Sequence, residues 1–190
     1  MNSLQLRYAL LNSVDNNIAV CAKDQLKYIM SDSFACIVNS QSSKEKGLHW
    51  VSFYKRQGKP IEYFDSLGLS LANYGKEFVN FATKFGSLVY VNDTQYQSNN
   101  SSCCGQFCIY FLINRDLNVP YAKILSQFSS VNLLENDKIV KRFVEKKFKF
   151  PTFSNCELFC KDRCLKDGIT LASVCFQENG SCIQILKNYT

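Results

Sequence analysis

Apolar positions recur along the chain with two different spacings, one typical of helices and one typical of strands. Helical spacing is clearest over residues 74–85, where Phe78, Phe81, Ala82 and Phe85 fall on one face. The pattern predicts helices over residues 4–11, 23–30, 74–85, 104–112, 119–128 and 132–148. It predicts strands over residues 34–38, 49–54, 61–64 and 88–91. Because strands and helices do not alternate as repeated strand–helix–strand units, we expect an α+β fold with a mixed β-sheet flanked by helices.

The chain of 190 residues is long enough for one domain with a substantial core. Pro151 marks a boundary, after which the last 40 residues carry half of the ten cysteines. We therefore expect a main domain over residues 1–150 and a cysteine-rich extension over residues 151–190 that packs on it. Within the extension, the sequence predicts a helix followed by a hairpin that turns at residues 178–180.

The composition is that of a soluble globular protein, with 46% hydrophobic and 20% charged residues. The longest apolar run, Phe107 to Ile113, is far shorter than the roughly 20 residues that span a bilayer, so we expect no membrane association. The first residues lack a basic start followed by an apolar block, so we expect a protein that is not secreted. In a reducing compartment its cysteines stay mostly thiols.

The net charge of +6 is concentrated in one predicted helix. Six basic residues fall within residues 138–149, namely Lys138, Lys141, Arg142, Lys146, Lys147 and Lys149. This cluster is compatible with nucleic acid as a partner. A solvated helix face is the favoured explanation, because apolar residues between these positions supply a stripe that can be buried.

His49 is the single histidine of the chain, so any step that needs an imidazole has one candidate. In the predicted hairpin, a five-residue loop centred on Gln57 places His49 directly opposite Asp65. Residues opposite one another on antiparallel strands have Cβ atoms about 5 Å apart. At that distance a carboxylate can accept the imidazole N–H and fix its tautomer.

Cys104 lies at the predicted amino end of the apolar helix, where free N–H groups and the helix dipole favour a thiolate. Gly105 beside it offers room for a substrate backbone. Gln97 could supply a side-chain N–H that, with the backbone N–H of Cys104, forms an oxyanion hole. Each residue alone has a structural explanation: a half-buried histidine, an aspartate that starts a turn, a packed thiol. Together they favour a nucleophilic cysteine site.

Four segments carry a family resemblance, at residues 35–39, 47–50, 64–68 and 97–107. Their order, spacing and flanking residues resemble adenain, the adenovirus maturation protease, whose clan includes the SUMO-specific proteases. The resemblance covers roughly residues 20–128. It implies a papain-like site at the amino end of a buried central helix, with His49 as base, Asp65 as its orienting acid, Cys104 as nucleophile and Gln97 in the oxyanion hole. By the same resemblance, Trp50 walls the site and Asn39 lies close to it.

Two differences from adenain bear on this interpretation. Adenain has a glutamate at the position where this chain has Asp65. The acid does not separate a resemblance to adenain from a resemblance to the SUMO proteases. The position of the adenain cysteine that binds an activating peptide corresponds here to Gly86, so we expect no activation through that disulfide. Activation by a peptide bound in another way, or by DNA, stays an open alternative, and we expect no other cofactor.

The resemblance implies a viral cysteine endopeptidase that cleaves capsid or structural precursor proteins during virion maturation, near glycine. The source expected is a DNA virus, a virophage or a virus-like transposon, and the location the virion and the host cytoplasm or nucleus. The alternatives are a deconjugating isopeptidase of SUMO or ubiquitin type, an acyltransferase on the same scaffold, and a non-enzymatic capsid-binding module. The intact set of site residues argues against the last.

The cysteines of the extension offer a second candidate site. Cys156, Cys160 and Cys164 would share one helix face, and with Cys175 and Cys182 they could bind zinc. Packing is the favoured explanation, because paired cysteine units and a spare histidine are both missing. We therefore expect no metal.

Overall fold

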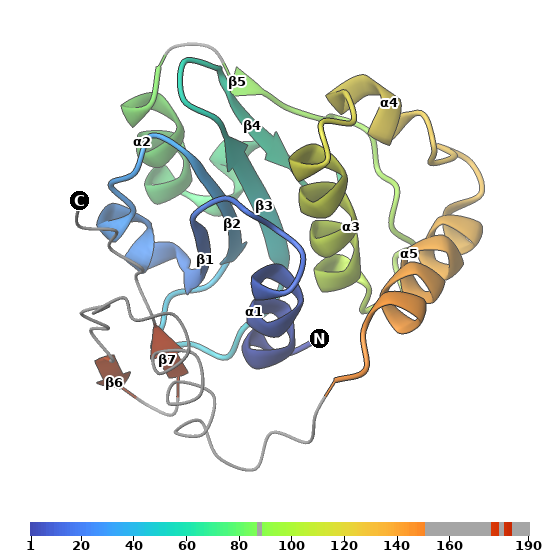
Figure 1. Ribbon diagram of the computed structural model, residues 1–190, viewed down its shortest axis with the longest axis horizontal. Coiled ribbons are helices and arrows are strands. Elements are labelled where there is room, and N and C mark those ends of the chain that lie inside the picture. The colour runs from blue at the N-terminus through green and yellow to red at the C-terminus, as the bar shows by residue number, and fades with distance from the viewer. Residues whose placement is uncertain (87–88, 151–175, 179–180, 184–190) are drawn as a thin grey trace.

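The computed structural model in Figure 1 has a five-stranded sheet with helices on both faces. The structure describes residues 1–86 and 89–150, together with the backbone of two short strands at 176–178 and 181–183. The five-stranded sheet comprises β1 (Ile18–Ala22), β2 (Phe34–Asn39), β3 (Trp50–Lys55), β4 (Ile61–Phe64) and β5 (Val89–Tyr90). The helices are α1 (Ser3–Leu11), α2 (Lys76–Lys84), α3 (Cys104–Asp116), α4 (Tyr121–Leu125) and α5 (Leu133–Lys147), with 3₁₀ turns η1 (Lys23–Tyr28) and η2 (Leu71–Tyr74). The predicted α+β class with a mixed sheet is confirmed.

The strands follow one another across the sheet in the order β1-β2-β3-β4-β5. The central strands β2, β3 and β4 are antiparallel, whereas β1 runs parallel to β2 and β5 runs parallel to β4. The parallel pairing of β4 with β5 brings the segments that follow these two strands to the same edge of the sheet. Part of the candidate site lies at that edge.

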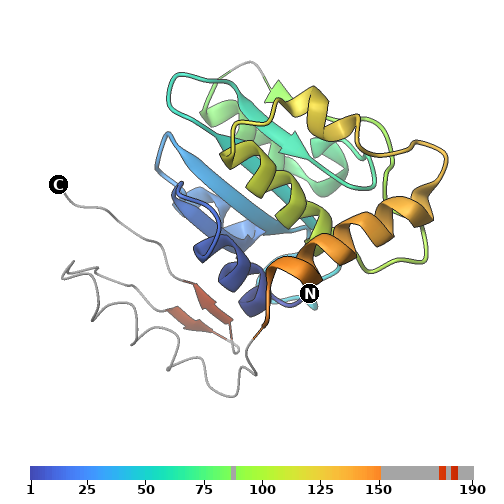
Figure 2. The same cartoon turned by 45° about the vertical axis from the view of Figure 1, so that its right-hand side comes forward.

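Each face of the sheet is covered by its own apolar cluster. On one face, α1, α3 and α5 pack over strand residues that include Ile37, Tyr54 and Phe64. The opposite face is covered by α2, whose Phe78 and Phe81 pack on β3 and β4. Figures 1 and 2 show α3 lying along the first face, between α1 and α5. Residues 107–113 of α3 are all buried, which explains why the helix is apolar nearly all round.

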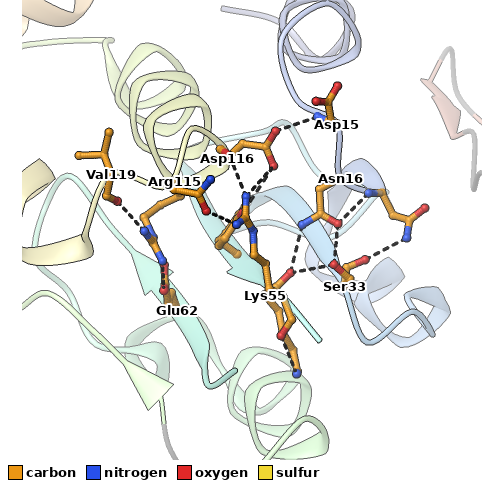
Figure 3. A network of polar contacts seen from close by, with 12 residues as sticks. Asp15, Asn16, Ser33, Lys55, Glu62, Arg115, Asp116 and Val119 are labelled. Carbon is orange, nitrogen blue, oxygen red and sulfur yellow. Dashed lines mark hydrogen bonds and ion pairs between the residues drawn. The ribbon is translucent and has the colours of Figure 1, made fainter. Parts of the chain in front are cut away.

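A network of polar contacts attaches the carboxyl end of α3 to the sheet (Figure 3). Arg115 donates to both carboxylate oxygens of Glu62 on β4, at 2.5 and 2.6 Å. The next residue, Asp116, accepts from the backbone N–H of Asp15 at 2.8 Å. These contacts at the carboxyl end hold α3 against β4 and the segment before β1, and so help to set the direction of the helix that begins at Cys104.

Several predicted elements differ in detail. The helix predicted over 23–30 is wrong, because residues 23–28 form the 3₁₀ turn η1. Within the predicted helix over 74–85, Tyr74 ends the separate turn η2 and α2 begins at Lys76. Helix α4 is shorter than the predicted 119–128. Strand β1 was not predicted. The hairpin predicted around residues 178–180 is formed by β6 (Phe176–Glu178) and β7 (Ser181–Ile183), which pair antiparallel. The predicted helix that carries Cys156–Cys164 lies outside the described residues.

Helix α5 has the predicted apolar stripe and solvated face. Val140, Val144 and Phe148 are buried, and all six basic residues of the 138–149 cluster are exposed. A nucleic-acid partner for this face stays a prediction. In the described part of the chain, every helix is too short or too polar to cross a membrane.

Candidate active site

His49 and Asp65 are in contact, although the predicted register is wrong by two residues. Phe53 pairs with Tyr63 and Tyr54 with Glu62, so the hairpin loop is centred on Gly58 and not on Gln57. A shift of two residues keeps every side chain on its predicted face. His49 and Asp65 therefore become diagonal neighbours just beyond the strand ends, still within reach of each other. The imidazole Nε2 lies 2.6 Å from Oδ1 of Asp65.

The carboxylate of Asp65 is fully buried and surrounded by donors. Besides the imidazole, Oδ1 accepts from the backbone N–H of Leu67 at 2.9 Å. Its other oxygen accepts from the N–H of Leu69 at 3.1 Å and from the hydroxyl of Tyr74 at 2.8 Å. A carboxylate held by these donors cannot rotate without breaking several hydrogen bonds, so it fixes the orientation of the imidazole.

Two neighbours of Asp65 were not recognised in the sequence. Tyr74 donates to its carboxylate and also stacks on the imidazole of His49, with ring centroids 5.9 Å apart. Asn92 bonds the Asp65 backbone in both directions, accepting from its N–H at 2.9 Å and donating to its carbonyl at 2.6 Å. Asn92 follows β5 as Asp65 follows the parallel strand β4. That topology is the signal that could have indicated Asn92.

Cys104 is the first residue of α3, as predicted, and it is partly exposed, whereas the preceding Cys103 is completely buried. The side chains of Cys104 and His49 lie near enough for each to shift the pKa of the other. Because Nε2 of His49 is bonded to Asp65, Nδ1 is the ring atom available to the thiol. One imidazole thus bonds the carboxylate of Asp65 and interacts with the thiol of Cys104.

The electrostatics of this contact favour an ion pair. Burial acts to raise the pKa of Cys104, but the hydrogen bond and charge of His49, followed by the N–H groups of Trp50 and Gly105, lower it below its usual value. Burial acts to lower the pKa of His49, but Asp65 and Cys104 outweigh it and raise the pKa to about 9. One helical turn further on, burial raises the pKa of Cys108.

The side chain of Gln97 is held in one orientation by two hydrogen bonds. Its Oε1 accepts from the hydroxyl of Ser66 at 2.7 Å, and its Nε2 donates to the carbonyl of Ser101 at 2.7 Å. Because a carbonyl only accepts, the amide nitrogen must face Ser101. Nε2 carries a second proton, which gives the site a further donor in the loop that leads into Cys104.

The other predicted site residues have more structural roles. Trp50 is half-buried, and its backbone N–H acts to lower the pKa of Cys104. Asn39 accepts from the N–H of Leu48 at 3.3 Å and so holds the segment that ends at His49. The expectation for Gly105 is wrong: a Cβ there would meet Leu6 at 3.1 Å and Met1 at 3.3 Å, so α1, and not a substrate, occupies that space.

A metal site is a separate question from this constellation. Among residues 1–86 and 89–150, no three or more histidine, cysteine or acidic side chains form a group that could hold a metal ion. The cysteines of the extension, for which zinc was considered, lie outside the described residues.

Comparison with known proteins finds distant likenesses. No family model matches the sequence. The chain is 22% identical over 157 residues to the uncharacterized protein V9 of Sputnik virophage, a match that covers 70% of this chain and 89% of that protein.

Among solved structures, the chain is similar to the ASFV pS273R protease, with a TM-score of 0.48 and 18% identity, over 78% of this chain. The match covers 65% of the ASFV chain, slightly less than two thirds of its length. It is also similar to the SUMO protease Ulp1, with a TM-score of 0.39 and 16% identity, over 72% of this chain and 78% of that one.

Proposed function

We propose that this chain is a cysteine endopeptidase that uses Cys104 as nucleophile, His49 as general base and acid, and Asp65 as the orienting acid. The observation that carries the proposal is the position of His49, which bonds a buried carboxylate and shares a mutual pKa shift with a helix-terminal thiol. Buried groups that are merely packed do not need this alignment. The raised pKa of His49 and the lowered pKa of Cys104 support a thiolate–imidazolium pair at neutral pH.

In the first half of the reaction, the thiolate of Cys104 attacks the carbonyl carbon of the scissile peptide bond. A carbon–sulfur bond forms, and the carbonyl electron pair moves to the oxygen. The backbone N–H of Cys104 and the second Nε2 proton of Gln97 stabilise that oxyanion. The imidazolium of His49 then gives its proton to the amide nitrogen, the carbon–nitrogen bond breaks, and the amine leaves.

In the second half, the neutral imidazole takes a proton from water, and the oxygen of that water attacks the thioester. Collapse of the second tetrahedral intermediate releases the carboxylic acid product and the Cys104 sulfur. The proton held by His49 restores the original ion pair. An amine in place of water would make the same site an acyltransferase.

We propose capsid or structural precursor proteins as the substrate, cleaved during virion maturation. The likeness to a virophage protein supports a viral setting. The exposed basic face of α5 would favour proteolysis beside packaged nucleic acid, whose charge is negative.

Co-expression with a candidate capsid protein tests the proposal. Wild-type protein should shorten the capsid protein, Cys104→Ala should leave it intact, and Cys103→Ala should process it, because Cys103 is buried at the helix cap. Processing by Cys104→Ala would refute the nucleophile. Labelling of Cys104 by ubiquitin- or SUMO-derived active-site probes, without capsid processing, would instead assign a deconjugating isopeptidase.

A further inference from the structure

The residues on either side of Gln97 are bound by two consecutive buried residues of α5. Asn136 donates to the carbonyl of Tyr96 at 2.9 Å. Asp137 accepts from the hydroxyl of Ser98 at 2.5 Å and from its N–H at 3.4 Å. Only 1% of Asn136 and 4% of Asp137 is exposed, in a helix whose outer face is otherwise strongly charged.

Burial of the polar side chains of Asn136 and Asp137 costs free energy, so their hydrogen-bond partners indicate their role. Asn136 has further bonds with the backbone of Ser129, which fix its amide. Asp137, by contrast, has Ser98 as the partner of both its oxygens. A buried carboxylate directed at one loop residue suggests that the position of that loop matters.

The opposite side of the same segment is bound to the turn that follows the catalytic acid. The N–H groups of Tyr96 and Gln97 both donate to the carbonyl of Ser66, at 2.8 and 2.9 Å. The hydroxyl of Ser66 donates to Oε1 of Gln97. Gln97 is thus held between the residue after Asp65 on one side and α5 on the other.

We propose that Asn136 and Asp137 are positioning residues that hold the Tyr96–Ser98 segment so that Nε2 of Gln97 is aimed at the oxyanion. This inference rests on the proposed function. Neither residue touches the thiol or the imidazole, and both act through the backbone beside Gln97. A displacement of about 1 Å in a preorganised donor is enough to reduce transition-state stabilisation severely.

The decisive variants are Ser98→Ala and Asp137→Ala, which remove the same contact from its two ends, with Glu135→Gln on the exposed side of α5 as the control. Ser98→Ala and Asp137→Ala should each lower kcat about tenfold or more while KM stays within about twofold, because the donor acts in the transition state. Alkylation of Cys104 by iodoacetamide should be unchanged, since it needs the thiolate but no oxyanion hole. Asp137→Asn should recover much of the activity, because an amide oxygen still accepts from Ser98.

A double-mutant cycle with Gln97→Ala separates positioning from general stability. Gln97→Ala alone should cost about 10²–10³ in kcat. In that background, Ser98→Ala should cost less than about twofold further, because the donor it positions is already gone. An equal further loss in the Gln97→Ala background, or full activity of Ser98→Ala, would overturn the inference. If Cys104→Ala also kept its activity, the proposed function itself would have failed.

Discussion

The ring of Tyr74 stacks on the imidazole of His49, while its hydroxyl donates to the carboxylate that the same imidazole contacts. Burial and the negative charge of Asp65 raise the pKa of Tyr74, so the hydroxyl keeps the proton that it donates. Tyr74 therefore supports both members of the His49–Asp65 pair. It comes from η2, outside the hairpin that holds the other two.

Replacing Tyr74 should separate its two contacts. Tyr74→Phe keeps the stacked ring and loses one of several donors to Asp65, so kcat/KM should fall about tenfold or less. Tyr74→Ala should cost more, because the imidazole loses the surface that holds its plane and excludes water. Steady-state kinetics on a processed capsid peptide measure both variants. Equal losses in the two would show that the ring contributes nothing.

Asp65 should set the alkaline limit of activity. The pKa of His49 is raised from 6.5 to about 9, so activity should decline as the pH rises through about 9, where the imidazolium loses its proton. Asp65→Asn removes the negative charge, so the alkaline limit should move towards 6.5 and kcat should fall about 10²-fold or more. The pH profile of kcat/KM tests this. An unchanged alkaline limit would mean that Asp65 does not govern the ionisation of His49.

The same ionisation should influence stability. Because the folded-state pKa of His49 lies above its unfolded value of 6.5, the His49 contribution to stability is fully present below that pH. It is lost as the pH rises through about 9. Urea unfolding of His49→Ala and wild type at pH values on both sides of this range should show their difference shrink at alkaline pH.

Gly68 should be far less replaceable than Gly58, although the two have nearly the same left-handed backbone, with φ of 68° and 69°. A Cβ on Gly68 would lie 2.6 Å from the backbone of Thr94, whereas one on Gly58 meets nothing within 4 Å. Gly58→Ala should cost only the conformational strain, about 1 kcal/mol. Gly68→Ala should cost about 1–3 kcal/mol more and reduce activity, because the Asp65 turn must move away from the segment before Gln97. Urea unfolding compares them, and equal costs would contradict the observed close approach.

The sequence predicted the positions of the candidate residues better than the positions of the residues that support them. The contact of His49 with Asp65 and the place of Cys104 at the start of α3 could be predicted because a single histidine, strand periodicity and an apolar helix each restrict the choice. The register error did no harm, because a shift of two residues preserves the faces of the strands. Strand parity alone cannot tell a loop centred on Gln57 from one centred on Gly58.

The features that the sequence did not predict depend on contacts between segments that are far apart along the chain. Asn92 reaches Asp65 only because β5 adds to the sheet parallel to β4, and a strand of two residues carries little periodicity. Strand β1 is a short run of small and apolar residues between polar segments, and its pairing with β2 decides its conformation. Asn136 and Asp137 occur in a helix full of polar residues, so only their burial distinguishes them.

Arg115 should contribute to stability from the carboxyl end of α3. Its bidentate pair with Glu62 and its position over the ring of Tyr54 hold α3 against the hairpin. Arg115→Met leaves the buried Glu62 unpaired and should destabilise the protein by about 3 kcal/mol. Arg142→Met, which removes an exposed pair with Glu135, should change stability by about 0.5 kcal/mol or less. Urea unfolding distinguishes the two, and a small effect at Arg115 would contradict the anchoring role.

The central claim is that His49 holds Cys104 as a thiolate, and the pH dependence of Cys104 alkylation tests it most directly. Iodoacetamide reacts with the thiolate, and mass spectrometry of the peptide that contains Cys104 isolates its rate from those of the other cysteines. In wild-type protein, Cys104 should react readily at about pH 6, and His49→Ala should lower that rate at least about tenfold, leaving the pH dependence of an ordinary thiol with pKa near 8.5. If both proteins instead show that ordinary dependence, Cys104 and His49 are not an ion pair, and the proposed active site is wrong.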